Sequence, residues 1–330
     1  YTFKKLAVEE VQEVVCRMVA SLIRKKVLEG CRLYGYYRVA VDGTGELTWQ
    51  ERHCEHCLTR KLGNGTTLYY HPILEAKLVT PNGFAFSLMT EFIENSDPLA
   101  DKQDCELKAC YRLAARLKAR FPRLPICLLL DGLYACGPVF QFCADYHWKY
   151  LVVLQDKDLK NVHRSYQVVL PHVLQNKKRL LLGPQLKTTQ NYRWVNAVEY
   201  VDSKKRLHLL NVLLCEETKP DSKGAMRTSQ HTWLTNFSIR MNNVDALANQ
   251  GGRLRWKIEN EGFNVQKNHG YGLGHKFSRV SFNAFKNYYQ AMQIAHLINQ
   301  LLIHSKEITQ LLKSRSNLTL KHLWKQLLSV

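Results

Sequence analysis

The sequence predicts an α/β fold in which helices cover a mixed sheet, and three observations lead to that prediction. Apolar, β-branched runs bounded by turn residues alternate with segments whose apolar residues recur at helical spacing. The chain has 330 residues, of which 45% are hydrophobic, so there is ample material for a large core. Two of the apolar runs end in the same Asp-Gly pair, at Asp42 and at Asp131.

The predicted elements have a defined order along the chain. Residues 6–30 carry apolar side chains at helical spacing and end at a glycine, which predicts an amphipathic helix. Three strands joined as hairpins follow it. A basic helix (104–121), an apolar central strand ending at Asp131, a helix (138–147) and a fifth strand come next. This order of strand, strand, strand, helix, strand, helix and strand is that of a ribonuclease H-like fold.

The composition changes again after the fifth strand. Polar turns and alternating runs dominate from residue 157, and helical character returns near residue 243, with an interruption expected at Gly251-Gly252. The predicted organisation is an N-terminal helical segment (1–35), the first part of the core (36–156), a β-rich insertion between the fifth strand and a Glu-bearing helix (157–240), the core segment with that helix (241–283) and C-terminal helices (284–330).

The charge balance favours a polyanionic partner. Lys and Arg number 47 against 28 acidic residues, so the formal net charge is +19, and nucleic acid is the commonest partner of such a surface. A merely alkaline housekeeping protein is the alternative. Ten cysteines without a repeating framework indicate reduced thiols of a cytoplasmic protein. No run of 18 apolar residues is present, so neither a membrane span nor a signal peptide is expected.

The two Asp-Gly pairs predict a metal site. A strand broken after Asp42 by glycines would end in a carboxylate, and the first and fourth strands of this topology are neighbours, so Asp42 and Asp131 should face each other. Adjacent carboxylates repel unless a cation lies between them, and Mg²⁺ prefers such oxygen ligands. Two ions would activate a water or a 3′-hydroxyl for phosphodiester chemistry. A single Asp-Gly after a strand is usually only a turn.

A third carboxylate is expected from the helix after the insertion. Glu259 is the candidate, and Glu261 is its competitor, pointing about 200° away on an α-helix. Arg255, four residues before Glu259, and Lys267, about two turns after it, would contact phosphates. Arg255 and Glu259 could equally be an ordinary surface helix pair.

The segments VAVDGTG, LLLDGLYA and RWKIENEGFN resemble the insertion-sequence transposases with a DDE catalytic triad, in the subgroup with a β-rich insertion before the Glu. KQDCELKACYRLAARLK, YHPILEAKLV, TEFIEN, HKFSR and YYQAMQIAHLINQ also resemble this group, so the similarity covers residues 35–305. This chain has Gly252 where the family signature has a Tyr, three positions before the Arg. Its Lys267 falls eight positions after the Glu rather than seven.

The resemblance implies a function and a set of site residues. Asp42, Asp131 and Glu259 would bind Mg²⁺, with Mn²⁺ as a substitute, and Arg255 and Lys267 would grip DNA phosphates. The partners would be the terminal inverted repeats and the target DNA, with a homodimer in the end-bound complex, in the prokaryotic cytoplasm at the nucleoid. Relatives carry an N-terminal DNA-binding domain. Residues 1–35 would be a truncated part of it, or end recognition is done elsewhere.

Other residues suggest further contacts. The cluster His53, Cys54, His56 and Cys57 suggests zinc, completed by His71 or another histidine, although a reduced hairpin loop is the commoner explanation. Trp194 and Trp233 in the insertion either stack on an extruded base, as in some relatives, or belong to the core. The basic residues of helix 104–121 either form a solvated face or touch DNA. Two rival functions remain, namely a ribonuclease H-like nuclease without strand transfer and a catalytically inactive DNA-binding protein.

Overall fold

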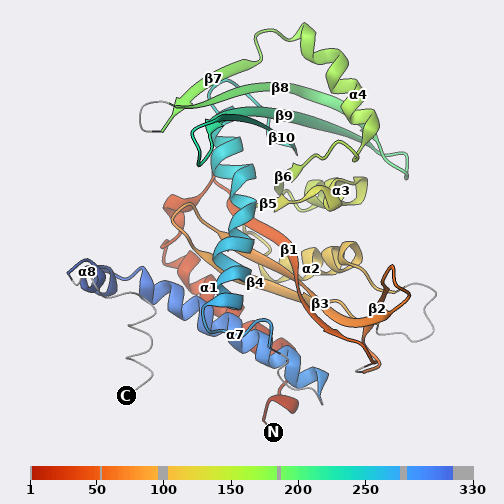
Figure 1. Ribbon diagram of the computed structural model, residues 1–330, viewed down its shortest axis with the longest axis vertical. Helices are drawn as coiled ribbons and strands as arrows, with labels where there is room; N and C mark the ends of the chain where they lie inside the picture. Colours follow the sequence, from red (N-terminus) through yellow and green to blue (C-terminus); the bar gives the residue numbers. More distant parts are fainter. Residues whose placement is uncertain (1, 53, 96–102, 184–186, 276–280, 315–330) are drawn as a thin grey trace.

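The computed structural model describes residues 2–52, 54–95, 103–183, 187–275 and 281–314. In this part of the chain one mixed, ten-stranded sheet runs in the order β2-β3-β1-β5-β6-β10-β9-β8-β7, with β4 paired to β3 (Figure 1). The predicted α/β class with a mixed sheet is therefore confirmed. The strands are β1 (Tyr37–Trp49), β2 (Leu58–Lys61), β3 (Thr67–Val79), β4 (Ala85–Phe92), β5 (Ile126–Leu130), β6 (Lys149–Val153), β7 (Lys177–Leu182), β8 (Thr188–Val201), β9 (Leu207–Pro220) and β10 (Met226–Thr235).

The centre of the sheet is parallel. β1 pairs with β5 and β5 pairs with β6 in parallel, whereas β3, β4 and β10 join antiparallel. All five residues of β5 are buried, as its continuous apolar sequence predicts for a central strand. The expected adjacency of the two strands that carry Asp42 and Asp131 is confirmed. The short strand β2, which the sequence analysis missed, adds an outer pair to β3.

Helices cover both faces of the sheet. One face packs α1, α2, α3 and α4 against side chains such as Val39 and Leu128, and the other packs a helical run between residues 244 and 268, together with part of α7, against Ala40 and Leu129. The α-helices on these faces are α1 (Val8–Arg24), α2 (Glu106–Arg120), α3 (Gly137–Asp145), α4 (Lys160–Val169) and α7 (Phe282–Ile303), with α8 (Lys306–Ser314) beyond them. Short 3₁₀ turns are η1 (Thr2–Lys4), η2 (Glu29–Cys31), η3 (Gly132–Tyr134) and η4 (Leu170–His172).

The helical run, drawn in cyan in Figure 1, changes type along its length. It consists of α5 (Val244–Ala246), the π-helix η6 (Leu247–Gly251), the 3₁₀ helix η7 (Gly252–Trp256), the π-helix η8 (Ile258–Phe263) and α6 (Asn264–Asn268). The expected interruption at Gly251-Gly252 is thus a change of helix type rather than an end. The glycines permit close packing, because a Cβ on Gly251 would lie 2.3 Å from Cδ1 of Leu151 and one on Gly252 would lie 2.5 Å from Nε1 of Trp233.

The β-rich segment continues the core sheet instead of forming a separate body. β10 pairs with β6 through Trp233 and Val153, and β7–β9 extend the sheet from there, as the upper part of Figure 1 shows. The helix α4, at the start of this segment, was not expected from the sequence. Arg253 of η7 forms a 2.9 Å ion pair with Glu217 of β9, so the segment also supports the helical run.

The two ends of the described chain pack together. In α1, Val15, Cys16 and Val19 are buried, and this helix contacts α7 and β4. Asn287 of α7 donates 2.9 Å hydrogen bonds to the carbonyl oxygens of Phe3 and Leu6. The described part of the predicted segment 1–35 therefore packs on the core, and α7 covers the chain's own sheet and α1. Among the described residues, no helix is long and apolar enough to cross a membrane.

Candidate active site

Asp42 and Asp131 occupy equivalent positions on neighbouring parallel strands. β1 and β5 pair Tyr37 with Ile126 and Ala40 with Leu129, an offset of 89 positions that also separates the two aspartates. Both side chains continue the row of Ala40 and Leu129, which faces the helical run. The two Asp-Gly pairs therefore bring two carboxylates to equivalent positions on neighbouring central strands of the sheet.

Asp42 does not end its strand, contrary to the expectation from Gly43 and Gly45. β1 continues to Trp49, still paired with β3, and its register shifts between Thr44 and Leu47. A β-bulge of this kind accommodates the glycines within the strand, so the pairing with β3 continues beyond them. Asp131 does follow the end of β5, where its Oδ1 accepts a 2.9 Å hydrogen bond from the backbone N–H of Leu133.

Arg255 contacts both Asp42 and Glu259 and so links the two carboxylates. Nη1 of Arg255 lies 3.2 Å from Oδ2 of Asp42 and 3.1 Å from Oε1 of Glu259. Glu261 instead forms a 3.3 Å pair with Lys257. Glu259, rather than Glu261, is thus the glutamate of the π-helix η8 that faces the aspartates. π-helical turns are rare and are frequent at functional sites.

The pKa of Asp42 is raised mainly by burial and further by nearby like charges. Burial raises the pKa of Asp42 to about 7, and the negative charges of Glu259 and Asp131 add to the increase, while Arg255 opposes it. The Asp42 side chain is 18% exposed, so solvent screens these charges only weakly. A cation is the natural counterpart of this group of carboxylates.

Glu106 is a fourth carboxylate that the sequence analysis did not single out. A Cβ on Gly43 would lie 2.9 Å from Oε2 of Glu106, so this side chain lies directly beside the Asp42-Gly43 pair. Its Oε1 accepts a 2.6 Å hydrogen bond from the Tyr134 hydroxyl. Burial raises the pKa of Glu106, and the charge of Asp131 acts in the same direction. The only signal in the sequence was an acid in the first turn of a helix, which the helix dipole already explains.

The donor set fits a hard cation, although an arginine lies among the ligands. Carboxylate oxygens are the ligands that Mg²⁺ prefers. Within the described residues, the ligand atoms of Asp42, Asp131 and Glu259 do not all come within 4.8 Å of one another. The Arg255 guanidinium lies against two of the three and neutralises part of their charge.

The other residues expected to contact DNA are placed differently. Trp194 and Trp233 are each only 3% exposed and belong to the second core cluster, so neither is available to stack on a base. The Trp233 ring also fills the space beside Gly252. Lys267 is exposed in α6 and makes no ion pair with any residue that the structure describes.

The fold brings only part of the proposed Cys/His set together. Cys54 and Cys57 converge with His71 of β3, and these three form a group with metal-ligating atoms close together. His56 instead lies 3.5 Å from Glu94 and stacks on the Phe282 ring. His53 lies outside the described residues.

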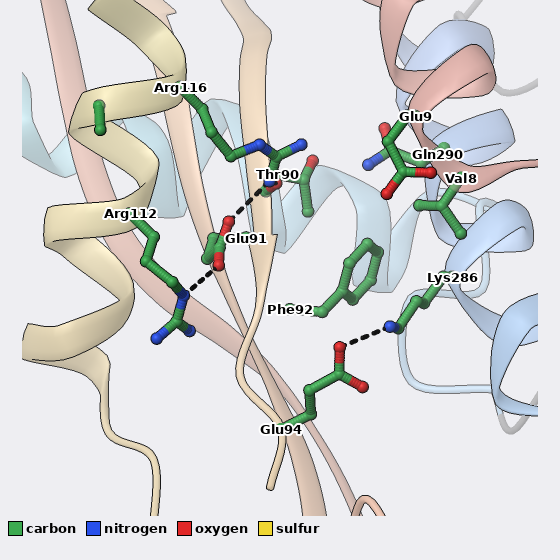
Figure 2. Close-up of a pocket in the computed structure, with 11 residues that line it drawn as sticks. Val8, Glu9, Thr90, Glu91, Phe92, Glu94, Arg112, Arg116, Lys286 and Gln290 are labelled. Atoms are coloured by element: carbon green, nitrogen blue, oxygen red, sulfur yellow. Dashed lines mark hydrogen bonds and ion pairs between the residues drawn. The ribbon is translucent and has the colours of Figure 1, made fainter. Parts of the chain in front are cut away.

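The basic helix α2 contributes to a surface hollow of about 490 Å³, shown in Figure 2. The cationic side chains that line the hollow are already in ion pairs. Arg112 and Arg116 of α2 lie 2.5 and 2.6 Å from Glu91, and Lys286 of α7 lies 2.7 Å from Glu94. None of the four clustered carboxylates, of Asp42, Glu106, Asp131 and Glu259, lines this hollow. The carboxylate cluster is therefore separate from this hollow.

Comparisons with known proteins add no family assignment. No protein-family model matches the chain, and no curated protein matches it.

Proposed function

We propose that this protein is a DNA transposase of the DDE type, with a ribonuclease H-like catalytic core. The observation that carries the proposal is the joint position of Asp42, Asp131 and Glu259, from two neighbouring strands and a helix more than 120 residues further along the chain. The strand order β4-β3-β1-β5-β6 and the formal charge of +19 support it.

Asp42, Asp131 and Glu259 would hold two Mg²⁺ ions. When bound, the ions would supply an activated water or 3′-hydroxyl and would stabilise the leaving oxygen of a phosphodiester. The chain's own residues do the rest. Arg255 presents its guanidinium to the same space and would contact a DNA phosphate there, since this fork of N–H donors matches phosphate oxygens. Glu106 would supply additional negative charge behind Gly43.

The proposal is tested with labelled duplexes that carry the DNA flanking the coding region, in Mg²⁺ and in EDTA. The variants are Asp131→Asn and Glu259→Gln, with Glu261→Gln as a matched control on the same helix. We expect the wild type and Glu261→Gln to cut at the ends and join them to target DNA. The other two variants should bind DNA but lose cleavage by at least about 100-fold, because each removes a charge that acts in the transition state.

Three other outcomes would contradict the proposal. Cleavage without joining in the wild type would identify a nuclease without strand transfer. DNA binding without cleavage in either Mg²⁺ or Mn²⁺ would identify a non-catalytic DNA-binding protein. Loss of cleavage in Glu261→Gln but not in Glu259→Gln would show that the wrong glutamate has been chosen.

A further inference from the structure

Three side chains with soft or borderline donor atoms converge away from the carboxylates. Cys54 and Cys57 lie in the loop between β1 and β2, and His71 lies on β3 opposite Leu47 of β1. The two sulfurs are 3.7 Å apart, and Nε2 of His71 lies 3.2 Å from Sγ of Cys54 and 3.4 Å from Sγ of Cys57. Both cysteines are free thiols.

These distances match the edges of a zinc tetrahedron. With zinc–sulfur bonds of about 2.3 Å and zinc–nitrogen bonds of about 2.0 Å, tetrahedral angles place two sulfurs about 3.8 Å apart and a sulfur about 3.5 Å from a nitrogen. One hydrogen bond between a thiol and an imidazole would explain one short distance. It does not explain why all three atoms approach one another at once.

We propose that Cys54, Cys57 and His71 bind a Zn²⁺ ion, with a water as the fourth ligand. Two thiolates and an imidazole suit zinc and are poor ligands for Mg²⁺, so this site is chemically distinct from the carboxylate cluster. Cys57 and His71 are buried, whereas Cys54 is partly exposed, so solvent reaches the cluster from the Cys54 side.

The backbone holds the two cysteines in a tight turn. The turn is closed by a 3.4 Å hydrogen bond from the N–H of Cys57 to the carbonyl oxygen of Cys54. Asn95 holds the turn from outside, since its N–H and its side-chain amide donate to the carbonyl oxygens of His56 and Cys57 at 3.3 Å each.

Aromatic rings hold the imidazole of His71 in place. It stacks on Phe282, the first residue of α7, with ring centroids 4.3 Å apart, and meets the edge of Trp49 at 5.4 Å. The ion would therefore fasten the β1–β2 loop to β3 and to the start of α7. Its role would be structural, holding the outer half of the β1–β3 strand pair rigid beyond Asp42.

The test is the zinc content of untagged protein purified in reducing buffer, measured by mass spectrometry of the metal. We expect about one zinc per chain in the wild type, and less than about 0.1 in Cys54→Ser, Cys57→Ser and His71→Ala. His56→Ala is the matched control, since it changes a histidine of the same turn, and Cys31→Ser controls for thiols. Both should keep their zinc, as should Asp131→Asn.

A second measurement uses only the wild type, so it tests the proposal even if the variants fail to fold. Chelation should lower the melting temperature by about 5 °C or more, and added Zn²⁺ should restore it, while Mg²⁺ should not. Cobalt-substituted protein should show thiolate-to-cobalt charge-transfer absorption.

Several results would overturn the assignment. These are a metal-free wild type with an unchanged melting temperature, a disulfide between Cys54 and Cys57 in place of zinc, stoichiometric iron in place of zinc, or loss of zinc from His56→Ala but not from His71→Ala.

Discussion

Arg255 is the residue on which the charge balance of the carboxylate cluster depends. Its side chain is 10% exposed and contacts both Asp42 and Glu259. An arginine between two acids keeps them together without a metal and can transfer its donors to a phosphate. The Arg255 guanidinium therefore offsets part of the repulsion between Asp42 and Glu259 in the absence of a metal ion.

Replacing Arg255 by Gln should expose this dependence. We expect a loss of about 2 kcal/mol in the free energy of unfolding in EDTA, because partly buried carboxylates are left unpaired. Excess Mg²⁺ should reduce that deficit, as a cation takes over the neutralisation. Urea unfolding under both conditions measures it, with Lys257→Gln, which should change stability by less than about 0.5 kcal/mol, as the control. Equal stability of Arg255→Gln and the wild type in EDTA would contradict the assignment.

His296 gives the fold a defined dependence on pH. It is 2% exposed, and its Nδ1 accepts a 2.9 Å hydrogen bond from Gln266. Burial lowers the pKa of His296 to about 3, and the positive charges of Lys77 and His269 act in the same direction. The folded state therefore keeps this imidazole neutral.

The sign of the effect follows from the lowered pKa. Above about pH 6.5 the imidazole is neutral in both states, and below it the unfolded chain takes up a proton that the folded chain excludes until about pH 3. We expect this residue to cost about 2 kcal/mol of stability at pH 5 relative to pH 7. Urea midpoints of the wild type should fall over this range more steeply than those of His296→Gln. Parallel curves for the two proteins would refute the prediction.

At the scale of elements, the helical run that carries Glu259 is positioned by close contacts with the sheet. Arg38 of β1 donates a 2.5 Å hydrogen bond to the carbonyl oxygen of Gln250, and Gly251 and Gly252 lie against Leu151 and Trp233. The changes from π to 3₁₀ and back to π accommodate these contacts. They decide which side chains of the run face Asp42.

Gly252→Ala should disturb this arrangement. The new Cβ would meet the Trp233 ring at 2.5 Å, so we expect a loss of about 2 kcal/mol in stability. Gly30→Ala is the control, because no atom lies within 4 Å of its Cβ position, and it should change stability by less than about 0.5 kcal/mol. Urea unfolding followed by tryptophan fluorescence measures both. A Gly252→Ala variant as stable as the control would show that the contact is not tight.

For the whole molecule, one continuous sheet links the carboxylate cluster to the β-rich segment. β10 pairs with β6, next to the strand that ends at Asp131, and Arg253 ties the helical run to β9. The segment therefore positions Glu259 as well as extending the surface.

The net charge of +19 predicts strongly salt-dependent DNA binding. Release of counterions from about six phosphate contacts should weaken binding by about 10³-fold between about 50 and about 200 mM salt. Fluorescence anisotropy with a labelled duplex of arbitrary sequence measures this, and Lys267→Gln should reduce the logarithmic slope by about 1 if Lys267 contacts a phosphate. An affinity that changes less than about threefold would exclude a polyelectrolyte interaction.

The sequence by itself determined the features that depend on local pattern. Hydrophobic periodicity located α1, α2, α3 and the central strands, because burial of one face imposes a period of 3.6 or 2 residues. The repeated Asp-Gly drew attention to Asp42 and Asp131, and the order of the predicted elements placed them on neighbouring strands. The Cys-x-x-Cys spacing located Cys54 and Cys57 of the proposed zinc site, and His71 was among the histidines expected to complete it.

The tertiary structure alone decided which distant residues meet. It chose Glu259 over Glu261, brought Glu106 beside Gly43, buried Trp194 and Trp233, and replaced His56 by His71 as the partner of the cysteines. These outcomes depend on strand register, helix type and packing between segments far apart in the chain. Local periodicity carries no information on such contacts, because each is set by the free energy of the complete packed core.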